Sequence, residues 1–379
     1  MGGSMYKTYK FRMYPTKEQI IMINKTFGCY RFIYNYFLNK CKNNKFIKAY
    51  YMCNELKKMY YEYEWLKEVD SCSLRCAIFN LEDAYKNFFN KRANYPIFKN
   101  KYNRQTYRTN CIRSSYKGKN YSNIKIDMKS KKIKLPKLGL IDIRGYRNLQ
   151  ECGGRVINAT IIKEVTGKYY VSVIVEEKEI DRKKVIPRTI VGIDLGVKDL
   201  VITSDGEKYS NSKEILKYEK RIKRLQRKLS RQVKGSNNYK KTKIRLAKLY
   251  SKVKNSRCHN IINIVNRIVK ENDIIVSEKL KVKRLSKNHT IAKYILDASF
   301  NKICNLLEWK SKVLGKYYYK VDTYYPSSKT CSVCGKKTDK TDDLSIRAWQ
   351  CERCGTSHDR DINASINIMY EGLKLMYNI

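Results

Sequence analysis

An alternation of aromatic or apolar residues with polar ones opens the chain over residues 6–14, where Pro15 ends it. A period of two is typical of a β-strand, so this segment is predicted to be one. Residues 107–179 have the same character, because short apolar runs are separated there by glycines. The clearest of these runs occupy residues 124–126, 132–135 and 169–175. Several short strands joined by turns predict a small β-barrel.

A helical pattern separates the first strand from these later ones. Thr16 and Gln19 stand at the spacing of a capping box, a signal for a helix start. From Lys17 to about Lys91, apolar residues recur every three or four positions without clusters of proline or glycine. Residues 16–105 are therefore predicted to be a helical insertion in the β-domain.

Four further segments predict a second sheet in the C-terminal half. Residues 189–194 and 273–278 are apolar runs that end in a carboxylate, as expected for strands buried on both faces. Residues 200–203 precede an Asp-Gly turn signal and are predicted to pair with the first of these runs as a hairpin. Residues 317–322 are predicted to be another strand of this sheet.

A long helical hairpin is predicted between the strands of the second sheet. Apolar residues fall at alternating spacings of three and four over residues 213–228, and they continue in that style over residues 246–268. Across residues 211–260 the acidic residues are Glu214 and Glu219, among many lysines and arginines. A solvated helix face usually mixes both signs, so a surface that lines phosphates is the favoured interpretation.

The net charge indicates a polyanionic partner. The 379 residues include 81 lysines and arginines against 35 aspartates and glutamates, a formal charge of +46. An A/T-rich genome would enrich lysine and the 32 tyrosines, but glutamate, whose codons are nearly as A/T-tolerant, has not kept pace. Such an excess favours nucleic-acid binding, and binding of the ribosomal kind would satisfy it equally well. The length predicts about two to four domains.

Cysteine usage favours a reducing cytoplasm. The 13 cysteines are odd in number, and no apolar signal stretch precedes them. No run reaches the roughly 18 apolar residues that span a bilayer, so no membrane partner is expected. Residues 1–4, which precede a second methionine at Met5, are interpreted as an expression scar.

Four cysteines carry the most specific isolated motif. Cys331 and Cys334 form one CxxC pair, and Cys351 and Cys354 form a second pair. Two such pairs can place four thiolates tetrahedrally around one zinc ion, which predicts a zinc ribbon. Because four thiolates leave no open coordination position, this ion is expected to be structural rather than catalytic. His358 lies close by in the sequence but is surplus to the set.

Three carboxylates are candidates for a catalytic metal site. Asp194 and Glu278 end two predicted strands, and Asp361 follows the ribbon at the expected start of a helix. Hydrolysis of a phosphodiester can use two Mg²⁺ ions, one to generate hydroxide and one to stabilise the leaving oxygen, and Mg²⁺ prefers oxygen ligands. Each acid also has an ordinary explanation: a turn residue, a strand-end charge and a helix cap, respectively.

Together these motifs resemble those of the TnpB family of transposon-encoded proteins, almost from end to end. Residues 6–19 resemble the opening strand of the family, 87–89 and 95–101 its FF and PxFKxK segment, 191–196 its GIDLG strand, 276–283 its xxEDLxVK strand, and 359–368 its DRDxNAAxNI signature. Lys279 and Ser365 stand where the family often has Asp and Ala, and neither is one of the three candidate acids.

The resemblance implies an RNA-guided DNA endonuclease with a multidomain α+β architecture. Asp194, Glu278 and Asp361 would be the RuvC carboxylates of an RNase H-like nuclease domain, into which the zinc ribbon is inserted. A wedge-like β-barrel, split by a helical recognition insertion, would hold a guide RNA transcribed beside the transposon. This front half would also read a short motif next to the double-stranded DNA target. A monomer per guide RNA is favoured.

The residue patterns and the resemblance together give domain boundaries, and position along the chain gives a first group of candidate nucleic-acid contacts. The boundaries are 5–15 and 106–187 for the wedge-like barrel, 16–105 for the helical recognition domain, 188–325 and 356–379 for the RuvC domain, and 326–355 for the zinc ribbon. Some of the residues where barrel and insertion meet are predicted to touch the motif duplex or the guide; these residues are Arg12, Lys99, Lys101, Gln105 and Arg108. Solvent-facing charge is the ordinary alternative for each.

Three other functions stay open at this point. A nuclease-inactive, RNA-guided DNA-binding repressor of the same lineage would have a broken acidic set, whereas all three acids are present. A self-sufficient transposase would need paired histidines and a nucleophilic tyrosine, but His259, His289 and His358 lie far apart in the sequence. A generic zinc-ribbon RNA-binding protein would keep every activity after the substitution Asp194→Ala.

Overall fold

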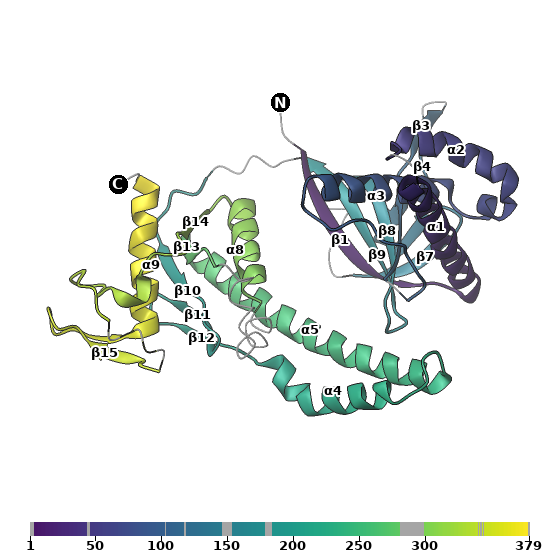
Figure 1. Cartoon of the computed structure of the whole chain (residues 1–379). Coiled ribbons are helices and arrows are strands. Elements are labelled where there is room, and N and C mark those ends of the chain that lie inside the picture. Colours follow the sequence, from purple (N-terminus) through teal and green to yellow (C-terminus); the bar gives the residue numbers. More distant parts are fainter. Residues whose placement is uncertain are drawn as a thin grey trace. The chain divides into compact units, whose positions relative to one another are not determined.

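The structure, a computed structural model, describes residues 4–43, 46–102, 104–116, 119–145, 154–178, 184–280, 299–339, 341, 343 and 345–377 (Figure 1). The described residues do not include residues 1–3 of the predicted expression scar or His289. They also do not include residues 281–283, the end of the segment that resembles the xxEDLxVK strand of the family. The chain divides into two compact units, residues 1–180 and 181–379. Each unit is built around its own hydrophobic core.

An antiparallel sheet of seven strands forms the first unit, in the order β2-β8-β9-β1-β7-β6-β5. Its strands are β1 (Ser4–Tyr14), β2 (Gln105–Asn110), β5 (Lys125–Asp127), β6 (Lys132–Leu135), β7 (Gly139–Arg144), β8 (Arg155–Lys163) and β9 (Tyr169–Lys178). A separate hairpin consists of β3 (Arg113–Tyr116) and β4 (Lys119–Ser122). The predicted strands are confirmed. Within the described part of the chain, no pairing of the edge strands β2 and β5 closes the sheet into the predicted barrel.

Helices of the first unit share the core of this sheet. They are α1 (Lys17–Asn43), α2 (Ala49–Glu62) and α3 (Ser71–Phe89), with the 3₁₀ turn η1 (Glu64–Glu68). The predicted capping box is present, because the Thr16 N–H donates to Gln19 Oε1 at 3.0 Å and the Gln19 N–H donates to Thr16 Oγ1 at 3.3 Å. Phe27 of α1 packs edge-on against Tyr107 of β2, with 5.5 Å between ring centroids. The boundaries predicted on either side of the helical insertion therefore cross one continuous core, and they stay predictions.

A mixed sheet of five strands forms the centre of the second unit, in the order β12-β11-β10-β13-β14. Its strands are β10 (Ile190–Asp194), β11 (Asp199–Thr203), β12 (Lys208–Ser210), β13 (Ile274–Glu278) and β14 (Tyr317–Val321). Strands β10, β13 and β14 run parallel, whereas β11 is antiparallel to β10 and to β12. The four predicted strands and the hairpin are confirmed. The three-residue strand β12 is too short to produce a pattern in the sequence.

Helices cover both faces of this sheet (Figure 1). α5 (Asn237–Glu271) and α8 (Phe300–Leu314) pack on one face, and α9 (Arg360–Tyr377) packs on the other. α4 (Glu214–Ser230) lies along α5 as the predicted helical hairpin, joined by a small core around Ile222 and Leu249. α8 was not predicted, although Phe300, Ile303 and Leu307 recur at helical spacing and are buried against the sheet.

The segment between β14 and α9 contains the turn η3 (Ser327–Lys329) and a hairpin of β15 (Ala348–Gln350) and β16 (Ser357–Asp359). β16 leads directly into α9, so this small element is joined to the sheet by the helix that covers it. The boundaries predicted at residues 187, 325 and 355 stay predictions. None of the described helices combines the length and the apolar character that crossing a bilayer requires.

Candidate catalytic and metal sites

Strand alternation turns Asp194 toward the face of the sheet that α9 covers. Val191 and Ile193 of β10 lie in the core that the sheet shares with α5 and α8. Because successive side chains of a strand point to opposite faces, Gly192 and Asp194 belong to the other face. That face is the one on which α9 packs.

Glu278 projects from the same face, one strand away. Val276 of β13 packs with Ile368 of α9, and Glu278 is two residues further along the strand. β13 runs parallel to β10 with Ser277 opposite Ile193. The residues that follow each of this pair, Glu278 and Asp194, therefore end neighbouring strands at one edge of the sheet.

Two glycines allow α9 to approach these strands closely enough to bring Asp361 to the same edge. A Cβ atom on Gly192 would lie 2.0 Å from the carbonyl oxygen of Ser365. A Cβ atom on Gly372 of the helix would lie 2.4 Å from both methyl groups of Val276. Only glycine tolerates backbone contact at these distances. Asp361 lies in the first turn of the helix held in this way.

The N-terminus of α9 is capped by Asp359 rather than by Asp361. Asp359 Oδ1 accepts the backbone N–H groups of Asp361 and Ile362, each at 3.1 Å, and Lys208 Nζ lies 2.6 Å from the other oxygen of Asp359. The carboxylate of Asp361 is thus not used as a cap, and it accepts Arg347 Nη1 at 3.2 and 3.1 Å. The ordinary explanation of Asp361 as a helix cap is wrong.

The three acids lie close enough to influence one another electrostatically. Burial, followed by the negative charges of Glu278 and Asp361, raises the pKa of Asp194 to about 7. The backbone N–H of Leu195 donates to Asp194 Oδ1 at 2.9 Å and opposes this rise. Burial also raises the pKa of Glu278. Carboxylates whose charges disfavour one another in a half-buried place favour a bound cation.

A network of hydrogen bonds ties Glu278 to α9. The hydroxyl of Ser327 donates to Glu278 Oε1 at 2.5 Å. Asn367 Nδ2 donates to the carbonyl oxygen of Ser327 at 2.8 Å and to that of Thr330 at 2.6 Å. Asn363 Nδ2 reaches the same Thr330 oxygen at 2.7 Å. The two buried asparagines of α9 therefore fix the segment that carries the hydroxyl partner of Glu278.

The three carboxylates are suitable ligands for a cation, but each one has a different hydrogen-bond partner within the protein. Across the described ranges, the only group of three or more His, Cys, Asp or Glu residues with ligand atoms close enough for one ion is a group of cysteines. Asp361 is paired with Arg347, whose side chain is 52 % exposed. An ion pair so exposed contributes at most about 1 kcal/mol, so a divalent cation can replace Arg347.

The four cysteines form a compact set that fits zinc. Their sulfur atoms, from Cys331, Cys334, Cys351 and Cys354, all lie within 4.8 Å of one another. The distances from Cys331 to Cys354 and from Cys334 to Cys351 are both 3.6 Å. Tetrahedral zinc with ligands at about 2.3 Å places its sulfurs about 3.8 Å apart. Hydrogen bonds from Thr356 lower the pKa of Cys354 to about 6, whereas the pKa of Cys334 in the same set is raised to about 11, so the spacing of the sulfurs is what supports zinc.

His358 lies beside this set without belonging to it. Its Nε2 is 3.1 Å from the sulfur of Cys331, and its ring lies 4.7 Å from the ring of Trp349 between centroids. The buried imidazole of His358 therefore hydrogen-bonds the sulfur of Cys331, one of the four candidate zinc ligands, and packs against Trp349 of β15.

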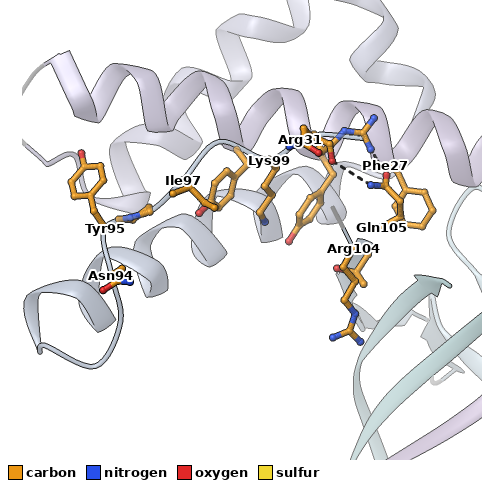
Figure 2. Close-up of a pocket in the computed structure, with 13 residues that line it drawn as sticks. Phe27, Arg31, Asn94, Tyr95, Ile97, Lys99, Arg104 and Gln105 are labelled. Carbon is orange, nitrogen blue, oxygen red and sulfur yellow. Dashed lines mark hydrogen bonds between the residues drawn. The ribbon is translucent and has the colours of Figure 1, made fainter. Parts of the chain in front are cut away.

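A cavity of about 450 Å³ in the first unit lies between α1 and residues 94–106 (Figure 2). Lys99 lines it, with Nζ 3.8 Å from the ring centroid of Tyr34 and 5.1 Å from that of Tyr30. Burial lowers the pKa of Lys99 to about 8. Asn35 of α1 holds the backbone of Lys99 through its N–H and its C=O, each at 2.8 Å. Lys99 is thus built into the wall of the cavity.

The other four residues predicted to touch nucleic acid lie in different environments in the structure. Gln105 also lines the cavity, where Arg31 donates to its side-chain oxygen (Figure 2). Lys101, Arg108 and Arg12 are not among the cavity-lining residues. Lys101 is exposed, whereas Arg108 Nε and Arg12 Nη1 are buried and have no hydrogen-bond partner in the described structure.

Sequence reasoning missed Arg347, Ser327 and the capping role of Asp359. The aspartate two residues before Asp361 was available as a capping signal, because Asp is among the preferred helix caps. Arg347 and Ser327 have no signal of their own, because they reach the acids only when the segment between β14 and α9 is folded against the helix.

Comparison with protein families gives three matches along the chain. Residues 171–289 match the family OrfB_IS605, described as a probable transposase. Residues 300–368 match the TNB domain described as Cas12f1-like, and residues 1–44 match a family described as a helix-turn-helix domain. Over the described part of that last range, the structure contains the strand β1 and the single helix α1.

Relatives of similar length cover nearly the whole chain. A protein of Streptomyces pristinaespiralis, provisionally named RNA-guided DNA endonuclease, is 33% identical over 98% of this chain and 91% of its own. InsQ of Escherichia coli K12, which carries the same provisional name, is 31% identical over 97% of this chain and 92% of its own.

Solved structures show the same kind of mixed α/β fold. The Cas12f1 chain in a cryo-EM structure of a Cas12f1-sgRNA-target DNA complex aligns with a TM-score of 0.55 at 14% identity, over 97% of this chain and 99% of that one. The mini-RNA-guided endonuclease CRISPR-Cas_phi3 aligns with a TM-score of 0.50 at 12% identity, over 98% of this chain and 93% of that one.

Proposed function

Because this chain belongs to the TnpB family of transposon-encoded proteins, we propose that it is an RNA-guided endonuclease that cuts double-stranded DNA next to a short transposon-adjacent motif. The observation that carries the proposal is the convergence of Asp194, Glu278 and Asp361. Two adjacent parallel strands and the first turn of α9 supply them to one edge of the sheet. The names of its relatives support the same activity.

The proposed nuclease domain is RNase H-like, of the RuvC kind. A hairpin of antiparallel strands followed by two parallel strands, with helices on both faces, is consistent with this assignment. The cysteine-bearing segment would then be a zinc ribbon inserted before the last helix. The first unit would correspond to the wedge-like domain and the helical recognition insertion.

Asp194, Glu278 and Asp361 would hold two Mg²⁺ ions. When bound, these ions would supply the hydroxide nucleophile and stabilise the leaving oxygen. The residues of the chain control protonation and position. Asp194 must release its proton before it can act as a ligand, since its pKa is raised to about 7. The Ser327 hydroxyl orients Glu278, and the Asp359 cap fixes the helix turn that presents Asp361.

The proposed partners are a guide RNA and the DNA that it selects, in the prokaryotic cytoplasm or nucleoid. The basic hairpin of α4 and α5 supports this, because its acids are few and partly paired: Glu214 with Lys217 at 2.8 Å and Glu219 with Lys223 at 3.0 Å. We propose that guide-target pairing supplies the sequence information and that the protein binds backbones. The five residues predicted to contact the motif duplex or the guide stay candidates: Arg12, Lys99, Lys101, Gln105 and Arg108.

One experiment separates this proposal from a nuclease-inactive repressor of the same lineage. The protein is expressed beside its native flanking DNA, the copurifying RNA is sequenced, and plasmids with a randomised adjacent motif are incubated with the complex and Mg²⁺. Asp194→Ala should reduce cleavage by on the order of 10³-fold or more and leave RNA and DNA binding intact. The control Asp339→Ala changes an exposed acid of the same unit and should cleave normally. A discrete RNA and DNA binding without cleavage, even in the unmodified protein, would favour the repressor.

A further inference from the structure

The cavity of about 450 Å³ beside α1 has a positively charged wall. Lys99, Arg31 and Arg104 line it, and none of the described lining residues is an aspartate or a glutamate (Figure 2). The tyrosines of the wall do not supply an anion either, because burial raises the pKa of Tyr30 and that of Tyr34. A small anion that enters this cavity is therefore attracted by its wall.

The amine of Lys99 lies in this wall without a polar partner among the described residues. Its Nζ forms no hydrogen bond or ion pair with them and lies against two rings, 3.8 Å from the centroid of Tyr34 and 5.1 Å from that of Tyr30. A ring face attracts an ammonium group less strongly than a carboxylate does, and burial disfavours the charge. Burial therefore lowers the pKa of Lys99 to about 8.

An amine in this state is a nucleophile near neutral pH. The reactive form of lysine is the neutral amine, because an ammonium group has no lone pair. At pH 7 roughly one Lys99 side chain in ten is neutral, against fewer than about one in a thousand for an ordinary lysine. The backbone hydrogen bonds to Asn35 and the contact with Tyr34 also hold the residue in place, which reduces the entropy lost in a reaction. Lys99 is therefore expected to react with small electrophiles that reach the cavity.

The arginines of the cavity determine which electrophile is favoured. A guanidinium group binds phosphate oxygens through parallel N–H donors. Arg31 donates through Nη1 to the side-chain oxygen of Gln105, a contact that orients the guanidinium (Figure 2). Arg104 lines the same cavity and is exposed. A small molecule with a phosphate for the arginines and an activated carbonyl carbon for the amine matches both features, and acyl phosphates are the smallest compounds of this kind.

We propose that acyl phosphates acylate Lys99 within this cavity, so that the lysine is a site of covalent modification. The nitrogen lone pair attacks the carbonyl carbon and forms a C–N bond, while the bond between that carbon and the bridging phosphate oxygen breaks. The nitrogen releases one proton, which the leaving phosphate takes up. The products are an amide and hydrogen phosphate, and no oxidant or cofactor is needed. Because the amide is neutral, each acylation removes one positive charge from the wall.

The test treats the full chain, freed of copurifying nucleic acid by a high-salt wash, with deuterated acetyl phosphate and quantifies the modified peptides by mass spectrometry. Lys99 should be acetylated roughly tenfold faster than Lys101 or more at about pH 7.5, and its rate should level off above about pH 8. Lys101 is the matched control, because it is exposed and also lies near a ring, 5.4 Å from the centroid of Tyr102. Arg104→Gln should slow acetylation of Lys99 several-fold, whereas Arg92→Gln, at an exposed position outside the lining set, should not.

Competition by inorganic phosphate tests the anion-binding part of the site in the unmodified protein. Phosphate should slow acetylation of Lys99 and leave that of Lys101 unchanged. Equal rates and equal pH profiles for the two lysines would overturn the inference. Fast reaction of Lys99 with acetic anhydride, which carries no phosphate, together with slow reaction with acetyl phosphate would also overturn it. Neither RNA binding nor DNA cleavage enters these measurements, so a failure of the proposed function would leave their outcome unchanged.

Discussion

The cysteine site and the carboxylate site of the second unit are built in different ways. Four sulfurs lie within 4.8 Å of one another, held by two tight turns and a short hairpin. The three carboxylates come from two strands and a helix, and each has its own partner: Leu195, Ser327 and Arg347. The cysteine site is local in sequence, whereas the carboxylate site exists only through the packing of α9 on the sheet.

This difference matches the two proposed roles. An ion that staples a small element is best held by ligands that already stand at their final distances. An ion that must meet a substrate phosphate is better held by few oxygens with room for water. We therefore expect a substitution that disturbs the packing of α9 on the sheet to impair the carboxylate site without loss of zinc. Loss of a cysteine ligand is expected to destabilise the ribbon.

The largest expected effect comes from Gly192→Ala. The added Cβ would lie 2.0 Å from the Ser365 carbonyl oxygen and 2.7 Å from the Met369 nitrogen, and backbone atoms cannot rotate away. We expect α9 to shift, cleavage to be lost, and the free energy of unfolding to fall by roughly 3 kcal/mol or more. Zinc content, measured by atomic absorption, should stay near one ion per chain.

Gly28→Ala is the matched control for this substitution. Gly28 lies in the interior of α1 and has no atom within 4 Å of an added Cβ. Alanine should therefore be tolerated and should raise stability by roughly 0.5–1 kcal/mol. Normal cleavage by Gly192→Ala would show that the three acids do not depend on the position of α9.

Cys351→Ser tests the other side of the comparison. Loss of one of four thiolates should lower zinc content and stability together, by roughly 2–3 kcal/mol in the free energy of unfolding. The control Cys258→Ser changes a half-buried cysteine of the same unit outside the set and should keep its zinc. Full zinc stoichiometry in Cys351→Ser would contradict the four-cysteine assignment.

The same contrast explains what the sequence could predict. The cysteine set follows from spacing alone, because a CxxC turn fixes its two sulfurs locally. The strands β10 and β13 follow from continuous apolar runs, which agree with their nearly complete burial. The α4-α5 hairpin follows from apolar residues at helical spacing, several of which form its small core. Asp194, Glu278 and Asp361 could be named from their motifs, but the register that aligns β10 with β13 is a tertiary property.

The first unit shows the limit most clearly. Lys99 was predicted as a nucleic-acid contact from its position, but its burial between two tyrosines depends on how residues 94–106 lie on α1. The sequence gives no register for β1 with β7 and β9, so the neighbours of Arg12 were not predictable. Register in a sheet is set by packing and turns across distant segments.

A smaller effect is expected from Asp194→Asn on stability. The folded-state pKa of about 7 lies above the unfolded value, so the folded protein holds this proton longer than the unfolded chain. Stability from this group is fully present below the unfolded pKa of about 4 and is lost progressively as the pH rises to the folded pKa of about 7. Asparagine carries no such penalty and should raise the free energy of unfolding near pH 8 by roughly 1–2 kcal/mol.

Thermal unfolding near pH 5 and near pH 8, without added metal, would check this expectation. The difference between the two proteins should be smaller at the lower pH, because it begins to grow only above the unfolded pKa of about 4 and is complete above about 7. Asp339→Asn, which removes an exposed charge, should follow the wild type at both values. A variant less stable than the wild type near pH 8 would show that the buried charge is already compensated by the protein.

The smallest expected effect, and the most specific, is that of Ser327→Ala. The hydroxyl of Ser327 opposes the rise that burial causes in the pKa of Glu278. Without it, that pKa should rise further, Mg²⁺ should bind more weakly, and cleavage near neutral pH should fall by roughly tenfold.

The pH profile distinguishes positioning from packing at this residue. If Ser327 acts through Glu278, the pH-rate profile of Ser327→Ala should move to higher pH and the loss should shrink with more Mg²⁺, while Ser327→Thr, which keeps a hydroxyl, should retain most activity. The control Ser332→Ala should be silent, because Ser332 contacts Asn363 through its backbone N–H at 2.9 Å. A loss of equal size at every pH would mean that Ser327 only fills space and that the position of Glu278 does not depend on its hydroxyl.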